Sequence, residues 1–189
     1  MKELNKEQQI KLLRLARKAI YVYLKEKKSL EVDRDEFSED IFSIKCGAFV
    51  TIHKAGMLRG CMGYIKGLES IPETIINTAR SSAFEDPRFP NLTEEEFNSI
   101  DIEISILSPI EEIRSISSIV VGRDGLIISQ GNRSGLLLPQ VATENNWGLL
   151  TFLENTCYKA GLNKDAWKSS DTNIEKFSAQ VFGEKELGL

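Results

Sequence analysis

The chain has 189 residues, enough for one domain or for two intimate subdomains with a real hydrophobic core. Hydrophobic residues make up 41% of it and charged residues 28%, values typical of a globular protein in water. A net charge of -4 argues against general affinity for nucleic acid or for an anionic membrane surface.

The N-terminal third predicts a helix followed by a hairpin. Apolar residues recur at helical spacing behind an N-cap at Asn5, with Gln8 placed as in a capping box, and the pattern fades by Ser29. Strand-forming residues then stand on each side of the turn sequence KAGM. This pattern predicts a hairpin over residues 47–63, with Cys61 on its second strand.

A second helix is predicted to begin after Ser70. Glu73 completes a capping box there, and apolar residues line one face of the segment as far as Ala83. The helix has to end before the loop EDPRFPNL, because the prolines remove backbone donors. Thr93 and Glu96 predict a short helix after this loop.

The remaining chain predicts mostly strands, the clearest of them SIDIEISIL at residues 99–107, where isoleucines alternate with polar residues. IVVGRDGLII, residues 119–128, predicts two short strands joined by a turn, and LLL before Pro139 predicts another. A helix over 147–161 and a strand over 176–182 follow. Because several strands join through short turns, they must be antiparallel, which makes the fold class α+β.

Cys61 is the first candidate for chemistry. The stretch LRGCMGYI, residues 58–65, places it two residues after Arg59 and between Gly60 and Gly63. A nearby cation lowers the pKa of a thiol, and glycines let a ligand approach the backbone. A small buried thiol in a bent strand has the same residue types. We favour the structural thiol and keep the reactive thiol as the alternative.

The register of the hairpin decides whether Cys61 can pair with His53, the chain's single histidine. A two-residue turn at Ala55 and Gly56 places Val50 opposite the cysteine and turns the histidine to the other face of the sheet. A three-residue turn places the cysteine and the histidine on one face. Turn statistics favour the shorter loop, which excludes the pair.

The loop AFEDPRFP is the second candidate. It gathers Glu85, Asp86 and Arg88 next to the prolines at positions 87 and 90, and rigid loops of this kind often carry binding or catalytic residues. In the alternative interpretation, Arg88 pairs with Asp86 or caps the preceding helix, and the loop is structural. The two carboxylates could also perform acid–base chemistry.

The stretch LLLPQVATENNW is the third candidate, because it follows a strand and precedes a helix, where backbone donors gather. Gln140 and Glu144 are its candidate binding residues. The plainer interpretation, which we favour, is a helix start whose free backbone N–H groups are capped by nearby residues. One histidine and three scattered cysteines predict no metal site, and no Walker or Rossmann glycine pattern is present. We therefore expect no cofactor.

Cysteine usage and hydropathy indicate a cytoplasmic protein. Cys46, Cys61 and Cys157 are widely spaced and form no CxxC pair, which argues against a disulfide framework and favours a reducing compartment. No apolar run approaches the roughly 20 residues that cross a bilayer. The N-terminal stretch MKELNKEQQI also lacks the apolar core of a signal peptide.

Six stretches together resemble the AMMECR family, also called protein A of the AmmeMemoRadiSam system. LRGCMGYI, AFEDPRFP, IEISILSP, VGRDGLII, LLLPQVA and FLENTCYKAGL occur in that family's order, over about residues 47–182. The resemblance implies a single domain over 1–189 with two subdomains, each an antiparallel sheet flanked by helices. The larger subdomain would come from both terminal parts of the chain and the smaller from roughly 60–100.

The family's signature hexapeptide falls on residues 58–63, with Met62 where isoleucine is usual. Some members have histidine where this chain has Asp124, so a mechanism that requires that histidine does not transfer. The resemblance implies companions, namely a Memo-like, dioxygenase-like protein and a radical SAM protein, without an established activity.

Two functions fit these residues. We favour a cytoplasmic module that presents a groove, lined by Arg59, the EDPRF loop and Gln140, to a partner protein or a small ligand. The alternative is a small-molecule enzyme with Cys61 as nucleophile or redox thiol, in which Arg59 holds an anion and Glu85 or Glu103 handles protons. The acidic charge balance predicts binding to neither nucleic acid nor membrane.

Overall fold

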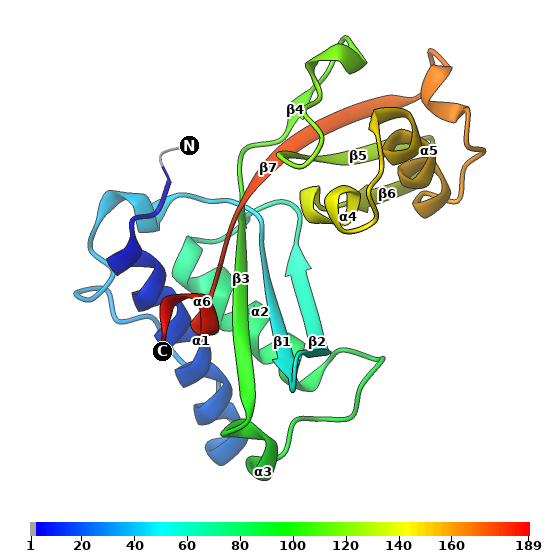
Figure 1. The fold of residues 1–189 in the computed structure, drawn as a ribbon. Helices are drawn as coiled ribbons and strands as arrows, with labels where there is room; N and C mark the ends of the chain where they lie inside the picture. Colours follow the sequence, from blue (N-terminus) through cyan, green and yellow to red (C-terminus); the bar gives the residue numbers. More distant parts are fainter. Residues whose placement is uncertain (1–2) are drawn as a thin grey trace. The chain divides into compact units, whose positions relative to one another are not determined.

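The computed structural model describes residues 3–189 and divides them into two compact units (Figure 1). The first unit runs through Leu107 and resumes from Gln180 to Leu189, so both terminal parts of the chain contribute to it. The second unit is Ser108–Ala179. Residues 60–100, expected to form the smaller subdomain, lie instead in the first unit, because their helix packs on the hairpin strands. The expectation of a single domain over 1–189 stays a prediction.

The first unit contains a three-stranded antiparallel sheet in the order β2-β1-β3, with two long helices packed on one face. The last four residues of β7 also belong to this unit. Its elements are α1 (Lys6–Glu26), β1 (Ala48–Lys54), β2 (Met57–Tyr64), α2 (Ile71–Phe84), α3 (Glu94–Phe97), β3 (Ile100–Leu107) and α6 (Glu184–Leu187).

The predicted helix starts are confirmed, because each capping box is present. In every case a side chain in the first turn accepts a hydrogen bond from the N–H of the capping residue, which satisfies a donor that the helix leaves unpaired. The accepting side chains of α1, α2 and α3 are those of Gln8, Glu73 and Glu96.

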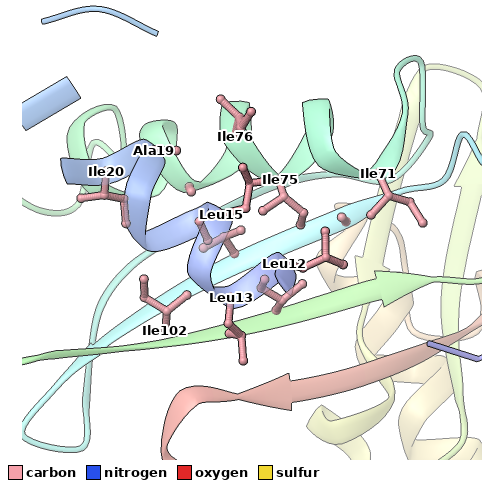
Figure 2. Packing of buried hydrophobic residues seen from close by; sticks show 14 of the residues in the cluster. Leu12, Leu13, Leu15, Ala19, Ile20, Ile71, Ile75, Ile76 and Ile102 are labelled. Atoms are coloured by element: carbon pink, nitrogen blue, oxygen red, sulfur yellow. The ribbon is translucent and has the colours of Figure 1, made fainter. Parts of the chain in front are cut away.

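The core of the first unit lies between the two long helices and the sheet. Figure 2 shows Leu12 and Leu13 of α1 packed with Ile75 of α2 and Ile102 of β3. The alternating isoleucines of β3, Ile100 to Ile106, are all buried, as their spacing predicts. Each fully buried side chain of this size contributes about 1.5–3 kcal/mol. One face of the sheet is therefore committed to the core, and the other face carries the polar residues.

The second unit contains four antiparallel strands, in which β7 pairs with β4 and β5, and β5 pairs with β6. Its main helix packs against β5 and β6 and buries Phe152, Leu153 and Cys157. The predicted α+β class is thus confirmed. The elements are β4 (Glu111–Glu112), β5 (Asp124–Gln130), β6 (Arg133–Leu137), α4 (Pro139–Glu144), α5 (Leu149–Lys159) and β7 (Asn173–Gly183).

Residues 119–128 differ from the expectation of two short strands, because only the second strand forms. The Asp124 carboxylate accepts a hydrogen bond from the Val120 N–H at 2.9 Å, and the Val120 carbonyl accepts from Arg123 and Asp124. These bonds close a turn and occupy the backbone groups that a first strand would need. Within residues 3–189, no helix combines the length and the apolar character needed to span a membrane.

Candidate functional site

The hairpin between β1 and β2 has the two-residue turn that the sequence favours. Lys54 pairs with Met57, and the turn residues Ala55 and Gly56 have φ angles of 52° and 78°. Two successive positive φ angles are typical of a type I′ turn, which matches the twist of the strands. From this turn alone, the thiol and the histidine would lie on opposite faces of the sheet.

A bulge at Arg59 overturns the register expected from that turn. The pairing shifts between Ile52 and His53, and beyond the shift Cys61 faces Thr51. Because one extra residue moves every later side chain of the strand to the other face, Cys61 and His53 share a face at diagonal positions. The expectation that a short turn excludes a shared face is therefore wrong.

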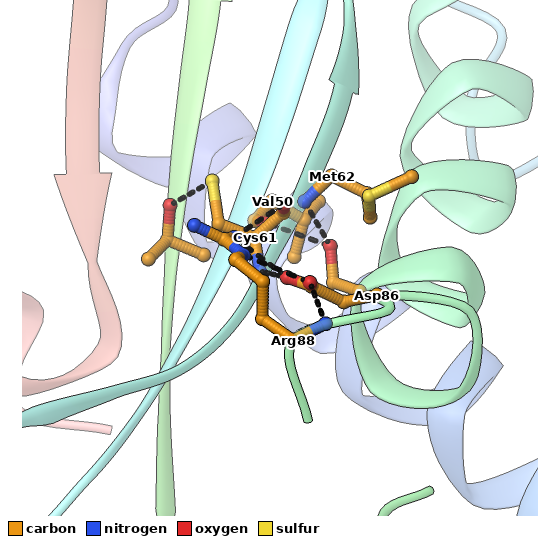
Figure 3. Close-up of polar contacts among 7 residues, drawn as sticks. Val50, Cys61, Met62, Asp86 and Arg88 are labelled. Atoms are coloured by element: carbon orange, nitrogen blue, oxygen red, sulfur yellow. Dashed lines mark hydrogen bonds and ion pairs between the residues drawn. The ribbon is translucent and has the colours of Figure 1, made fainter. Parts of the chain in front are cut away.

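Cys61 is the end of a row of polar side chains that crosses the three strands. Thr51 pairs with Cys61 on one side and with Glu103 of β3 on the other, and all three residues are half-buried. Thr51 Oγ1 donates a hydrogen bond to Cys61 Sγ at 3.3 Å (Figure 3). His53 and Asp101 form the next pair on this side, which is turned away from α1 and α2. We call these five residues the polar face.

Two residues of the loop AFEDPRFP hold the main chain of Cys61 from outside the sheet. Asp86 Oδ2 accepts from the Cys61 N–H at 2.9 Å, and Arg88 Nη2 donates to the Cys61 carbonyl at 3.3 Å (Figure 3). Asp86 and Arg88 also form a bidentate pair, with N–O distances of 2.9 and 2.7 Å. Within residues 3–189, β2 is the outermost strand of its sheet, so this pair closes an edge.

The pairing with Arg88 governs the charge of Asp86. The guanidinium of Arg88, together with the N–H groups of Cys61 and Arg88, holds the pKa of the buried Asp86 carboxyl well below its usual range. The sequence alternative in which Arg88 pairs with Asp86 is confirmed. What sequence reasoning missed is that the pair acts on Cys61, which joins two candidate stretches into one structure.

Ser82 of α2 stands inside the ladder between β1 and β2. Its Oγ accepts from the Met62 N–H at 2.8 Å and donates to the Val50 carbonyl at 2.7 Å (Figure 3). The helix can come this near because Gly60 has no side chain: a Cβ there would lie 2.1 Å from the Ser82 carbonyl oxygen. Gly60 therefore serves the contact between the strand and the helix, and its predicted role in ligand binding stays a prediction.

Gly63 is likewise surrounded by packed atoms. A Cβ at this position would lie 2.3 Å from the ring of Phe49, on the opposite strand. Gly60 thus leaves room for a carbonyl of α2, and Gly63 leaves room for the ring of Phe49. The strand also bends at the bulge formed by Arg59. Each of these contacts fixes the position from which the Cys61 side chain projects.

Arg59 is buried, with 9% of its surface exposed, and it turns toward α3. Its guanidinium forms a bidentate pair with Glu96, at 3.1 and 2.9 Å, and Lys54 Nζ donates to the same carboxylate at 2.9 Å. These two cations, Arg59 first, lower the pKa of Glu96 to about 2. Sequence reasoning missed Glu96 as a partner of Arg59, although its place in a capping box singled it out.

The ring of Phe89 lies beside both arginines, with its centroid within 6 Å of the guanidinium carbons of Arg59 and Arg88.

The other predicted site residues have separate surroundings. Glu85 caps the end of α2, where its carboxylate accepts from Ser81 Oγ at 2.6 Å and lies 3.3 Å from an arginine nitrogen. Gln140 and Glu144 lie on α4 in the second unit, half-buried and exposed respectively. Their convergence with Arg59 in a groove stays a prediction. In residues 3–189, no three His, Cys, Asp or Glu side chains gather closely enough to hold a metal ion.

Replacement of Glu96 by glutamine is expected to lower the free energy of unfolding by about 2 kcal/mol at pH 7. Because the pKa of Glu96 is lowered to about 2 in the folded chain, its stabilisation is complete above the unfolded value of about 4.3. It is lost as the pH falls from there through about 2, and below that pH the variant and the parent chain should become equal. Urea titrations at several pH values measure this difference.

The matched control is Glu95→Gln, which removes an exposed carboxylate from the same short helix. Its effect should stay within about 0.5 kcal/mol at every pH. A Glu96→Gln variant that resembles this control at pH 7 would show that the pair with Arg59 contributes nothing to stability.

Comparison with known proteins gives consistent matches over almost the whole chain. The AMMECR1 family model matches residues 13–182. A protein of Methanothermobacter thermautotrophicus is 44% identical over 179 residues, covering 92% of each chain. A Methanosarcina barkeri protein is 42% identical over 180 residues, covering 92% of this chain and 89% of its own length. The crystal structure of an uncharacterised protein from Pyrococcus horikoshii matches with a TM-score of 0.85 and 41% identity, covering 94% of this chain and 91% of that one.

Proposed function

We propose that this chain, which belongs to the AMMECR1 family, is a cytoplasmic binding module that presents its polar face to a Memo-like or a radical SAM protein. One observation carries the proposal: the main chain of Cys61 is fixed by the Asp86–Arg88 pair, while its side chain stays partly exposed. A surface held in this way loses little conformational entropy when a partner binds, which favours recognition.

The charges near Cys61 support binding over catalysis. A nucleophilic thiol needs a base or a free cation within reach. Arg59 is paired with Glu96, and Arg88 is paired with Asp86, so both cations of the predicted site already have carboxylate partners. The hydrogen bond that reaches the Cys61 sulfur comes instead from the neutral hydroxyl of Thr51.

Selective blocking of Cys61 tests the binding proposal. Cys46 and Cys157 are buried, and burial raises the pKa of both thiols, to about 11 for Cys46, so maleimide should label Cys61 alone in the folded chain. The labelled chain is titrated by calorimetry with the purified Memo-like protein and with the purified radical SAM protein of the same organism. We expect unlabelled chain to bind one of them and labelled chain to bind at least about tenfold more weakly.

The matched control carries the label elsewhere on the same sheet. Met57 at the tip of the hairpin is 71% exposed, so a Met57→Cys substitution in a Cys61→Ser background moves the label away from the polar face. This chain should bind like the unlabelled one. Failure of both partners to bind the unlabelled chain, or equal loss of binding with both labels, would contradict the proposal.

The second candidate function is a small-molecule enzyme with Cys61 as nucleophile, and the bulge at Arg59 favours it by placing His53 and Cys61 on one face. The rate of alkylation by iodoacetamide at pH 7 separates the two functions. The binding module predicts a rate no greater than that of free glutathione. An activated nucleophile predicts a rate at least about tenfold greater, which His53→Gln would abolish.

A further inference from the structure

A hollow of about 570 Å³ lies between α1, α3 and α6, in the first unit. It is on the helical side of the sheet, whereas the polar face with Cys61 is on the other side. Cationic side chains and apolar side chains both line it. The cations are Arg14, Arg17 and Lys18, and the apolar group is formed by Tyr21, Phe97 and Ile100.

The three cations of this hollow differ in what they contact. Arg17 forms a bidentate pair with the buried Glu184, at 2.6 Å for each nitrogen, so its charge is already balanced. Arg14 and Lys18 are exposed, one helical turn apart, and neither forms an ion pair with any of residues 3–189. Two like charges at this spacing repel each other, and an anionic partner would relieve that repulsion.

The apolar part of the hollow lies beside these two cations. Tyr21 is 47% exposed, and its ring centroid lies 5.6 Å from that of Phe97, in a tilted arrangement. Half-exposed aromatic rings are common anchor points at protein interfaces. The combination fits a ligand that is acidic on one side and apolar on the other.

We propose that the hollow binds an acidic peptide segment of a partner protein, with carboxylates on Arg14 and Lys18 and an apolar side chain against Tyr21 and Phe97. The charges fit this occupant, because Arg14 and Lys18 have no carboxylate partner among residues 3–189, whereas Arg17 of the same hollow is paired with Glu184. The Cβ atoms of residues one turn apart are about 6 Å from each other. Glutamates at positions i and i+2 of an extended peptide have nearly the same separation.

An array of short synthetic peptides tests this surface with the full chain. The peptides carry glutamate at positions i and i+2 and phenylalanine or leucine at position i+4, so that all of these side chains share one face of an extended chain. Each peptide has a counterpart with glutamine in place of every glutamate. We expect the glutamate peptides to bind, their glutamine counterparts to bind at least about tenfold more weakly, and binding to weaken as salt screens the charges. The measurement is fluorescence anisotropy of labelled peptides.

Charge reversal on the rim assigns the binding to the hollow. Arg14→Glu and Lys18→Glu, each at an exposed position, should reduce affinity for the glutamate peptides by at least about tenfold together. Lys66→Glu, at an exposed position outside the hollow, should leave affinity unchanged. Circular dichroism confirms that the variants are folded, and Cys61→Ser should bind like the parent chain, which separates this surface from the polar face.

Three outcomes would overturn the proposal. These are the failure of every glutamate peptide to bind, equal binding of the glutamine peptides, and unchanged binding after both reversals at Arg14 and Lys18. Vesicles that contain phosphatidylserine serve as a further probe. Adsorption to them that is lost in the same variants, without peptide binding, would assign the two cations to a lipid surface and reject the peptide.

Discussion

The Gly60→Ala variant is expected to have a free energy of unfolding about 3 kcal/mol below that of the parent chain. The added Cβ would lie 2.1 Å from the carbonyl oxygen and 3.1 Å from the carbonyl carbon of Ser82. These are main-chain atoms within α2, so they cannot move without the helix. Any retreat of the helix would also stretch the Ser82 hydrogen bonds to Met62 and Val50. Urea denaturation followed by circular dichroism measures the difference.

A glycine of the same unit provides the control. At Gly183 the nearest atom to an added Cβ is the Ile102 carbonyl oxygen at 3.6 Å, an ordinary contact. The Gly183→Ala variant should therefore differ from the parent chain by no more than about 0.5 kcal/mol. An equal loss in both variants would mean that the effect at Gly60 comes from replacing any glycine of this unit by alanine. It would then not come from the close contact with α2.

The Asp86→Asn variant is expected to lose about 3 kcal/mol of stability at pH 7. The carboxylate is buried and accepts from the Cys61 N–H and from the Arg88 side chain, and an amide cannot replace these charged contacts. We place the loss at the low end for a buried pair because the Arg88 side chain is 54% exposed and stays hydrated. Urea titration at pH 7 measures the loss.

The pH dependence of this loss follows from the direction of the Asp86 pKa. Arg88 holds the folded pKa below the unfolded value of about 3.9, so the charged carboxylate stabilises the fold fully above about pH 5. The stabilisation decreases as the pH falls below about 4, and the Asp86→Asn and parent curves should approach each other there. Asp35→Asn, at an exposed position, should show no such convergence. A constant gap between the Asp86→Asn and parent curves down to low pH would contradict the assigned charge.

Local physical chemistry was enough to predict most of the elements. The capping boxes at Gln8, Glu73 and Glu96 depend on residues three positions apart, and all of them formed. The alternation from Ile100 to Ile106 depends only on the geometry of a strand. The segment 119–121 does not form a strand because the Asp124 side chain accepts the Val120 N–H that strand pairing would need. Counting β-branched residues does not reveal this competing hydrogen bond.

The site was less predictable, because its geometry depends on contacts between distant residues. The bulge at Arg59 is accompanied by the pair with Glu96, which lies 37 positions later, and turn statistics contain no such partner. Ser82 can bond to the main chain of β2 only because α2 packs closely on that strand at Gly60. No local sequence pattern specifies which face of the helix packs on which strand. The contacts of Asp86 and Arg88 with the main chain of Cys61 join residues 25 and 27 positions apart, and no local pattern predicts them.

The ion pair on the outer strand has a consequence for self-association. An unprotected strand edge is a template on which a second copy of the chain can add a strand and start a fibril. Here the Asp86 carboxylate and the Arg88 guanidinium occupy the N–H and the carbonyl of Cys61 that an incoming strand would use. A second copy would have to expel a charged pair to dock at this position, so the loop that fixes the main chain of Cys61 also guards the sheet against aggregation.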